Sequence, residues 1–226
     1  MPRIFPYSSP LQLAPNLWQV TGSFGMPGVP RNMTVVRTEQ GELVLYSVIA
    51  MHEEGMRALE GLGRPSVMVI PHRRHQMDAP FFKQRYPALR VLAADPARVT
   101  GVTVDGPLTE LGRFGIETYV LPGNVQEDTV MDVPIETGRA LCVCETLNNI
   151  STSGFLSVLL RVLGPPGGGF GVPRAVRWRE IRDRDALRAW LQKQSERTDL
   201  RFLLFGHGAP LTSDIPGALR RAASGA

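Results

Sequence analysis

The sequence has few cysteines and lacks a long apolar run. Only two cysteines, Cys142 and Cys144, occur among 226 residues, one residue apart on a predicted strand. A bond between them would require a strained turn, so we expect no disulfide framework. The longest apolar stretches, Leu43–Ala50 and Phe155–Leu163, are too short or too interrupted to span a bilayer. Prolines break residues 1–17, which have no run of signal-peptide type. We therefore expect a cytoplasmic protein with no membrane partner.

Positive charge is concentrated in one segment. The net charge is +4, and the whole excess lies in Arg174–Arg201, which holds nine basic and five acidic residues. Such a segment is either a footprint for nucleic-acid phosphates or the solvated face of a helix. Because acidic residues are mixed into it, we favour the solvated helix and expect no nucleic-acid partner.

The alternation of apolar runs and turns predicts a single α/β domain over residues 1–226. Hydrophobic residues make up 43% of the chain, enough for a packed core. Strands are predicted at Met33–Thr38, Glu42–Ser47, Val67–Ile70, Leu89–Leu92, Glu117–Leu121, Thr129–Val133, Arg139–Cys144 and Leu200–Phe205. Helices are predicted at Glu53–Leu62, Ala79–Tyr86, Phe155–Leu163, Asp183–Arg197 and Ile215–Ala223. Glycines and prolines predict a loop at Gly164–Pro173. The first two strands are predicted to form a hairpin, a turn at Glu136-Thr137-Gly138 is predicted to join two later strands, and Asp183 is predicted to be the N-cap of its helix. This order favours strands of mixed direction in one domain.

Side chains that can bind a metal follow three of these strands at the point where each strand ends. They are His72, His75, Glu145 and His207. In open α/β sheets, ligands bind beyond the carboxyl ends of the strands. Imidazole and carboxylate groups are the ligands of catalytic zinc and iron sites. The pattern therefore indicates one candidate metal site.

The order of these motifs resembles that of the metallo-β-lactamase superfamily, over about residues 17–211. Pro71–Asp78 stands where the family has His-x-His-x-Asp-His, and Gly206–Pro210 matches its Gly-His-Gly-x-Pro closely. Pro122–Asn124 corresponds to its Pro-Gly-His, and Cys144-Glu145 to its Gly-Asp at a strand end. The resemblance implies a metallo-β-lactamase-like αββα sandwich with mixed sheets, in a divergent bacterial branch whose metal-binding motifs are degraded.

The departures from the family pattern change the expected chemistry. Arg74, Gln76 and Met77 replace a histidine, an aspartate and a histidine, and Asn124 replaces another histidine. A two-metal site is therefore not expected, and Arg74 adds positive charge where a second ion would be. The resemblance instead implies one divalent ion, with zinc favoured, held by ligands that differ from the family's own set. These ligands are His72, His75, Glu145 and His207. Activated water would then attack an ester, amide or phosphoester, with Arg74 and Glu145 as catalytic residues.

A second interpretation gives the protein no metal and no catalysis. The fold would bind a small anionic ligand or a protein partner, attracted by Arg73 and Arg74. Several candidates also have ordinary structural interpretations. Asn124 would be a turn residue and Asp78 an N-cap, and the tryptophans Trp178 and Trp190 would serve in core or helix packing.

Overall fold

The computed structural model describes residues 3–23, 25, 29–151, 164–165 and 169–225. The chain divides into two compact units, Met1–Thr118 and Tyr119–Ala226. The predicted helix Phe155–Leu163 lies outside the described residues. None of the helices in the described part of the chain combines the length and the apolar character that a membrane crossing requires.

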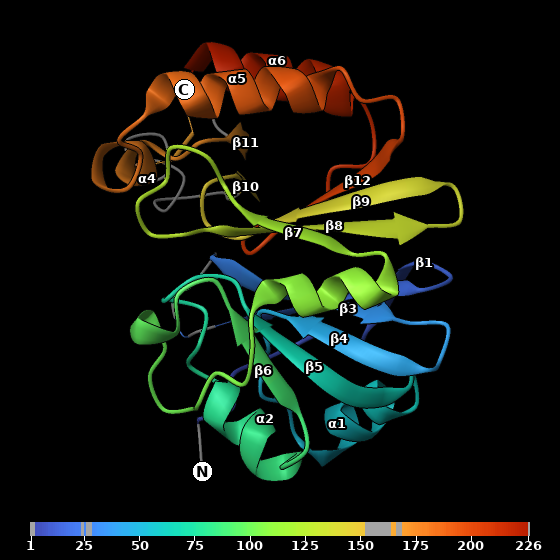
Figure 1. The fold of residues 1–226 in the computed structure, drawn as a ribbon. Helices are drawn as coiled ribbons and strands as arrows, with labels where there is room; N and C mark the ends of the chain where they lie inside the picture. The colour runs from blue at the N-terminus through green and yellow to red at the C-terminus, as the bar shows by residue number, and fades with distance from the viewer. Residues whose placement is uncertain (1–2, 24, 26–28, 152–163, 166–168, 226) are drawn as a thin grey trace. The chain divides into compact units, whose positions relative to one another are not determined.

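The first unit is built on a six-stranded mixed sheet whose strand order follows the sequence (Figure 1). Its strands are β1 (Leu11–Ala14), β2 (Leu17–Ser23), β3 (Pro30–Arg37), β4 (Glu42–Tyr46), β5 (Arg64–Ile70) and β6 (Arg90–Ala93). Neighbours from β1 to β4 are antiparallel, which confirms the predicted β3–β4 hairpin, and β4, β5 and β6 are parallel. The sequence analysis missed β1 and β2, because they follow a proline-rich segment without a strong apolar run.

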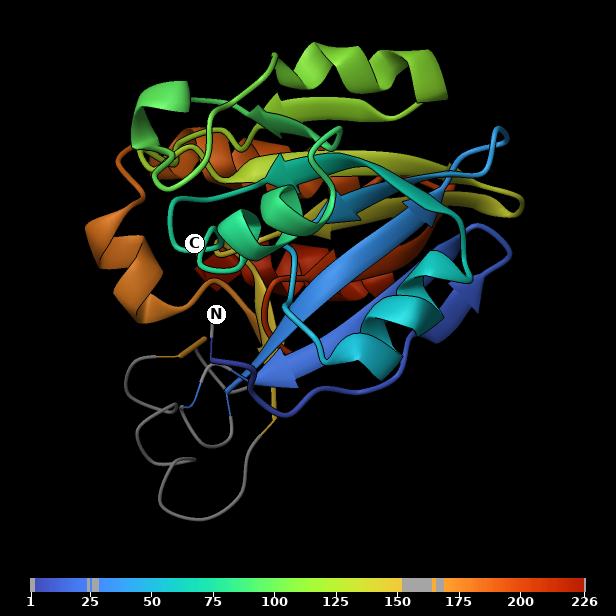
Figure 2. The ribbon, with the colours of Figure 1, turned by 90° about the horizontal axis from the view of Figure 1, so that it is seen from below.

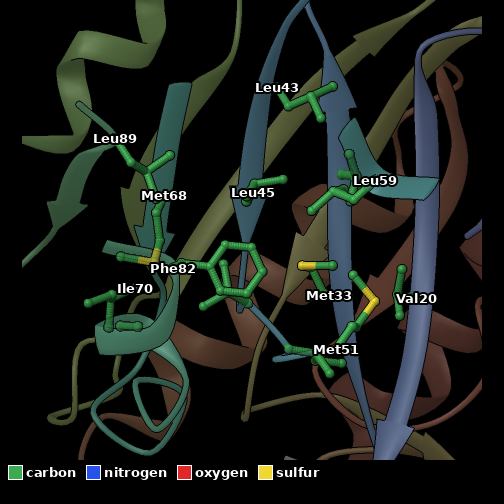
Figure 3. Packing of buried hydrophobic residues seen from close by; sticks show 14 of the residues in the cluster. Val20, Met33, Leu43, Leu45, Met51, Leu59, Met68, Ile70, Phe82 and Leu89 are labelled. Atoms are coloured by element: carbon green, nitrogen blue, oxygen red, sulfur yellow. The ribbon is translucent and has the colours of Figure 1, made fainter. Parts of the chain in front are cut away.

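Two helices cover one face of this sheet. They are α1 (Glu53–Glu60) and α2 (Ala79–Arg85), and they lie on the same side of the strands (Figures 1 and 2). Leu59 of α1 and Phe82 of α2 are fully buried against Leu45 and Met68 of the sheet (Figure 3). Burying a side chain of this size stabilises the fold by roughly 1.5–3 kcal/mol. Two short 3-10 turns, η1 (Pro96–Arg98) and η2 (Leu108–Phe114), complete the unit.

The second unit has a four-stranded sheet in the order β12-β9-β8-β7. Its strands are β7 (Glu117–Val120), β8 (Thr129–Ile135), β9 (Gly138–Val143) and β12 (Leu200–Phe205). β8 and β9 form the predicted antiparallel hairpin, and β12 pairs with β9 in parallel. A separate antiparallel pair is formed by β10 (Asn148–Ile150) and β11 (Gly169–Gly171), so the segment Gly164–Pro173, predicted to be a loop, contains a short strand.

The helices of the second unit are α4 (Arg174–Arg179), α5 (Arg184–Ser195) and α6 (Ile215–Gly225). α5 and α6 pack side by side over the sheet (Figure 1). As predicted, Asp183 caps α5 by accepting a hydrogen bond from the Ala186 N–H, at 2.9 Å. Trp190 is 6% exposed and belongs to the core, whereas Trp178 is 57% exposed. Of the two packing roles expected for Trp178, the core position is therefore wrong, because Val176 is the buried residue of α4.

Candidate functional site

The predicted histidines of the first unit lie on a tight loop directly after β5. We call residues 71–78 the histidine loop. His72 and His75 are both buried, at 2% and 6% exposure, and the His75 N–H donates to the His72 carbonyl at 2.8 Å. The backbone turn brings the two rings onto one short loop, as their spacing predicts.

The His75 ring is held by the end of β4. Its Nδ1 lies 2.7 Å from the Ser47 hydroxyl oxygen, and this contact is buried. Ser47 has a positive φ of 63°, so the chain bends sharply as it leaves the strand. When Nδ1 donates its proton to this hydroxyl, Nε2 carries the lone pair that a metal ion needs. Ser47 therefore orients His75, a role that the sequence analysis did not assign.

The hydrogen bonding of His72 differs from that of His75. Its Nδ1 accepts a hydrogen bond from the Arg74 N–H, at 3.3 Å. A neutral imidazole that accepts at Nδ1 carries its proton on Nε2 and offers no further lone pair. The observed contact therefore favours a role for His72 in shaping the loop. The Arg74 side chain, the predicted anion-stabilising group, is exposed to solvent.

A buried ion pair anchors the end of the histidine loop. The Asp78 carboxylate pairs with Arg31 of β3 and accepts a hydrogen bond from the Ala50 N–H at 2.8 Å. Asp78 occupies the N-cap position of α2, as expected, but its side chain makes no capping hydrogen bond to that helix. Burial lowers the pKa of Arg31 to about 10, which leaves it charged at neutral pH. The sequence signal for this pair was a charged residue, Arg31, just before the predicted strand Met33–Thr38.

In the second unit, Glu145 and His207 lie beside each other. Glu145 follows β9 and His207 follows β12, and these parallel strands pair Val143 with Phe205. Each residue therefore stands two positions beyond a matched pair at the carboxyl end of the sheet. Glu145 Oε1 and His207 Nε2 are 3.6 Å apart, with side chains 8% and 12% exposed. For these two residues, the predicted convergence of strand ends follows from the strand register.

Asp128 fixes the turn that carries Glu145. It is fully buried, and its two carboxylate oxygens accept hydrogen bonds from the N–H groups of Cys144, Glu145 and Thr146, at 3.2, 3.0 and 2.7 Å. Three consecutive amides around one carboxylate hold the backbone in a single conformation. The sequence analysis gave Asp128 no role.

Gly208 and Asn124 shape the surroundings of the pair. Gly208 has φ +96°, and a Cβ there would lie 2.0 Å from the Asn149 carbonyl oxygen, so only glycine fits. The Asn149 N–H also donates to the His207 carbonyl at 3.1 Å. Asn124 accepts from the Gln126 N–H at 2.6 Å and donates to the Thr146 hydroxyl at 2.9 Å. These bonds agree with the turn role considered for Asn124. Cys142 and Cys144 are buried and form no disulfide bond in the described part of the chain.

Solved structures with the same architecture were found over nearly the whole chain. The crystal structure of the DIM-1 metallo-β-lactamase exposed to ceftazidime has a TM-score of 0.68 at 14% identity, covering 98% of this chain and 99% of that one. The chain has the metallo-β-lactamase fold. A metallo-β-lactamase from Pontibacter korlensis has a TM-score of 0.65 at 13% identity, covering 96% and 99%. FIM-1 from Pseudomonas aeruginosa, in its mono-zinc form, has a TM-score of 0.62 at 13% identity, covering 99% and 97%.

The metallo-β-lactamase fold is thus shared at a very low level of sequence identity. No family model matches the chain, and no curated protein matches it either. The fold expected from the order of motifs is confirmed. Likeness at this level concerns the backbone arrangement, so the chemistry of the metallo-β-lactamase fold in this chain has to be argued from its own side chains.

Proposed function

We propose that this chain is a hydrolase that uses one divalent metal ion to cleave an ester, amide or phosphoester. Zinc is the favoured ion. Glu145 and His207 are the central ligands. The metallo-β-lactamase fold supports a hydrolase-like architecture, and the proposal adds the single ion and its ligands.

The separation of Glu145 and His207 is the observation that carries this proposal. At 3.6 Å, Oε1 and Nε2 are too far apart for a hydrogen bond. Two ligand atoms bound to one tetrahedral zinc at bonds of about 2.1 Å lie about 3.4 Å apart. The pair is therefore spaced as two ligands of one ion are. Both side chains are largely buried, which suits a site that excludes bulk water.

We take the third ligand from the histidine loop, as the sequence predicts. His75 is the better donor there, because its contact with Ser47 leaves Nε2 available. His72, the fourth predicted ligand, accepts the Arg74 amide at Nδ1, so we assign it to the shape of the loop. Three protein ligands and one open position are typical of catalytic zinc sites.

The chain's own groups supply the remaining chemistry. A bound divalent ion lowers the pKa of water towards neutrality and polarises a carbonyl or phosphoryl oxygen. The Glu145 oxygen that does not hold the ion would accept the proton that the attacking water loses. It would then pass this proton to the leaving oxygen or nitrogen as the bond from that atom to the substrate carbon or phosphorus breaks. The exposed Arg74 guanidinium stabilises the negative charge that develops on the substrate.

Elemental analysis of protein purified without an affinity tag or chelator tests the proposal. We expect about one equivalent of zinc, iron or manganese per chain in the wild type. The content should fall in His207→Ala, Glu145→Gln and His75→Ala. His52→Ala is the matched control, because His52 is an exposed residue at the start of α1, and it should retain the metal. A metal-free wild type that shows no thermal shift with added zinc would overturn the proposal.

A second candidate function is binding of a small anionic ligand without a metal. The observation that favours it is the exposure of Arg73 and Arg74 side by side on the histidine loop. It predicts a metal-free protein whose melting temperature rises with inorganic phosphate. That rise should disappear when both arginines are replaced by glutamine.

A further inference from the structure

Trp178 is the only tryptophan of this chain that faces solvent. The chain has three tryptophans, and Trp18 and Trp190 are 5% and 6% exposed. Trp178 is 57% exposed, and it lies on α4, the helix that precedes α5 in the chain (Figure 1). A large aromatic side chain that is more than half exposed offers apolar area to a partner.

Three exposed arginines accompany this ring. Arg179, Arg182 and Arg184 form no ion pair with any other residue that the structure describes. The Arg182 guanidinium donates to the Trp178 carbonyl at 3.4 Å, which places it beside the same turn. By contrast, Arg188 pairs with Asp185, and Arg197 pairs with Asp132 and Asp199. We call Trp178, Arg179, Arg182 and Arg184 the α4 basic surface.

Among the described residues, none of the acidic side chains from Glu180 to Asp185 forms an ion pair with Arg179, Arg182 or Arg184. Glu180 is buried at 1% exposure, and Asp183 caps α5. Asp185 is engaged by Arg188 at 2.6 Å. The expectation of no nucleic-acid partner depended on acidic residues diluting the arginines. In the described part of the chain, these acids do not pair with the three arginines.

We propose that the α4 basic surface binds single-stranded nucleic acid. The Trp178 ring would stack on one base, and the guanidinium groups of Arg179, Arg182 and Arg184 would contact the flanking phosphates. A membrane surface fits less well, because an interfacial helix buries several apolar side chains. On α4 only Trp178 is an exposed large apolar residue, since Val176 faces the core. This binding is independent of the proposed metal ion.

The affinity for a fluorescently labelled 12-nucleotide oligothymidylate, measured by anisotropy at low salt, tests this surface. Trp178→Ala should weaken binding about 5- to 150-fold, through the loss of one stacked base. Arg179→Gln and Arg182→Gln should each reduce the slope of log affinity against log salt by about 0.7. Arg188→Gln is the matched control, because this arginine is paired with Asp185, and it should leave the affinity and the slope unchanged. All four positions lie outside the buried core, so these variants should fold.

Intrinsic fluorescence gives an independent readout of stacking. An unlabelled oligonucleotide should quench the emission of the wild type strongly and that of Trp178→Ala weakly, because the other two tryptophans are buried. Absence of binding at low salt would overturn the proposal. Binding that Trp178→Ala does not weaken would also overturn it, since the contact would then be purely electrostatic. A blue shift with vesicles containing phosphatidylserine, without any response to the oligonucleotide, would assign the surface to membranes instead. None of these outcomes depends on the metal content.

Discussion

The histidine loop of the first unit and the Glu145–His207 pair of the second unit are held in place by different interactions. The histidine loop is fixed by side chains, namely the Asp78–Arg31 ion pair and the hydrogen bond between Ser47 and His75. The turn that carries Glu145 is fixed by backbone amides gathered around Asp128, and the segment of His207 by a glycine with positive φ.

This difference predicts how the histidine loop and the turn that carries Glu145 each respond to mutation. Removing one member of a buried ion pair leaves the other charge uncompensated, which is costly. Removing a carboxylate from three amides leaves neutral donors unpaired, which costs less for each group. Comparable substitutions in these two segments therefore test whether charge or backbone geometry dominates the stability of each segment.

We expect the largest effect from Asp78→Ala, which leaves Arg31 buried without its partner. The free energy of unfolding should fall by about 3–5 kcal/mol, measured by urea denaturation. The double variant Arg31→Leu/Asp78→Ala removes both charges and should be less destabilised than Asp78→Ala alone. If the double variant is the less stable of the two, charge pairing is not what holds the loop.

Asp128→Asn should have the next largest effect. Asparagine retains one oxygen acceptor but places an NH2 group against the amides of residues 144–146, so the free energy of unfolding should fall by about 2–3 kcal/mol. The same urea experiment measures it. Metal content should also fall, because the turn positions Glu145. Asp128→Glu, which retains the charge but not the fit, separates the two causes: an equal loss would show that geometry matters more than charge.

Ser47→Ala should be milder. It removes one buried hydrogen bond to His75, and the free energy of unfolding should fall by about 1 kcal/mol. If His75 is a metal ligand, zinc affinity should fall about 10-fold, as is usual when the partner of a ligating histidine is lost. A zinc titration competed with a chromophoric chelator measures this. Ser47→Thr, which retains the hydroxyl, should recover most of the affinity, and its failure to do so would exclude the proposed orienting role.

Sequence patterns predicted the elements that bury continuous apolar runs. β3, β4, β5 and β12 all appear near their expected places, and α5 begins after the predicted cap. Elements without such runs were missed: β1, β2, β10, β11 and α4. Short strands such as β10 and β11 are defined by their pairing with each other, which no local pattern encodes.

The candidate site residues divide in the same way, into those that local sequence patterns predict and those that they miss. The candidate residues could be named because they follow strands, but the groups that hold them could not. Arg31 lies 47 residues before Asp78, and Asp128 lies 17 residues before the Glu145 amide that it accepts from. Contacts of this range depend on the folded topology. Trp178 illustrates the opposite error, since its apolar character alone indicated a core position.

The smallest loss of stability is expected for a surface carboxylate of the second unit. Asp199 pairs with Arg197 at 2.8 Å, and its hydrogen bond to that guanidinium lowers the pKa of the carboxyl below its ordinary value. A lowered folded-state pKa stabilises the protein above the unfolded pKa, and this contribution is lost as pH falls through the folded value. Because Asp199 is 45% exposed, solvent screening limits the effect of Asp199→Asn to less than about 1 kcal/mol at neutral pH. Urea denaturation of both proteins from pH 7 to pH 3 should show the difference shrinking below about pH 4. If the difference in the free energy of unfolding stays constant over this range, Asp199 contributes through its shape and not through its charge. The buried Asp78–Arg31 pair of the first unit would then be the stronger case for electrostatic stabilisation.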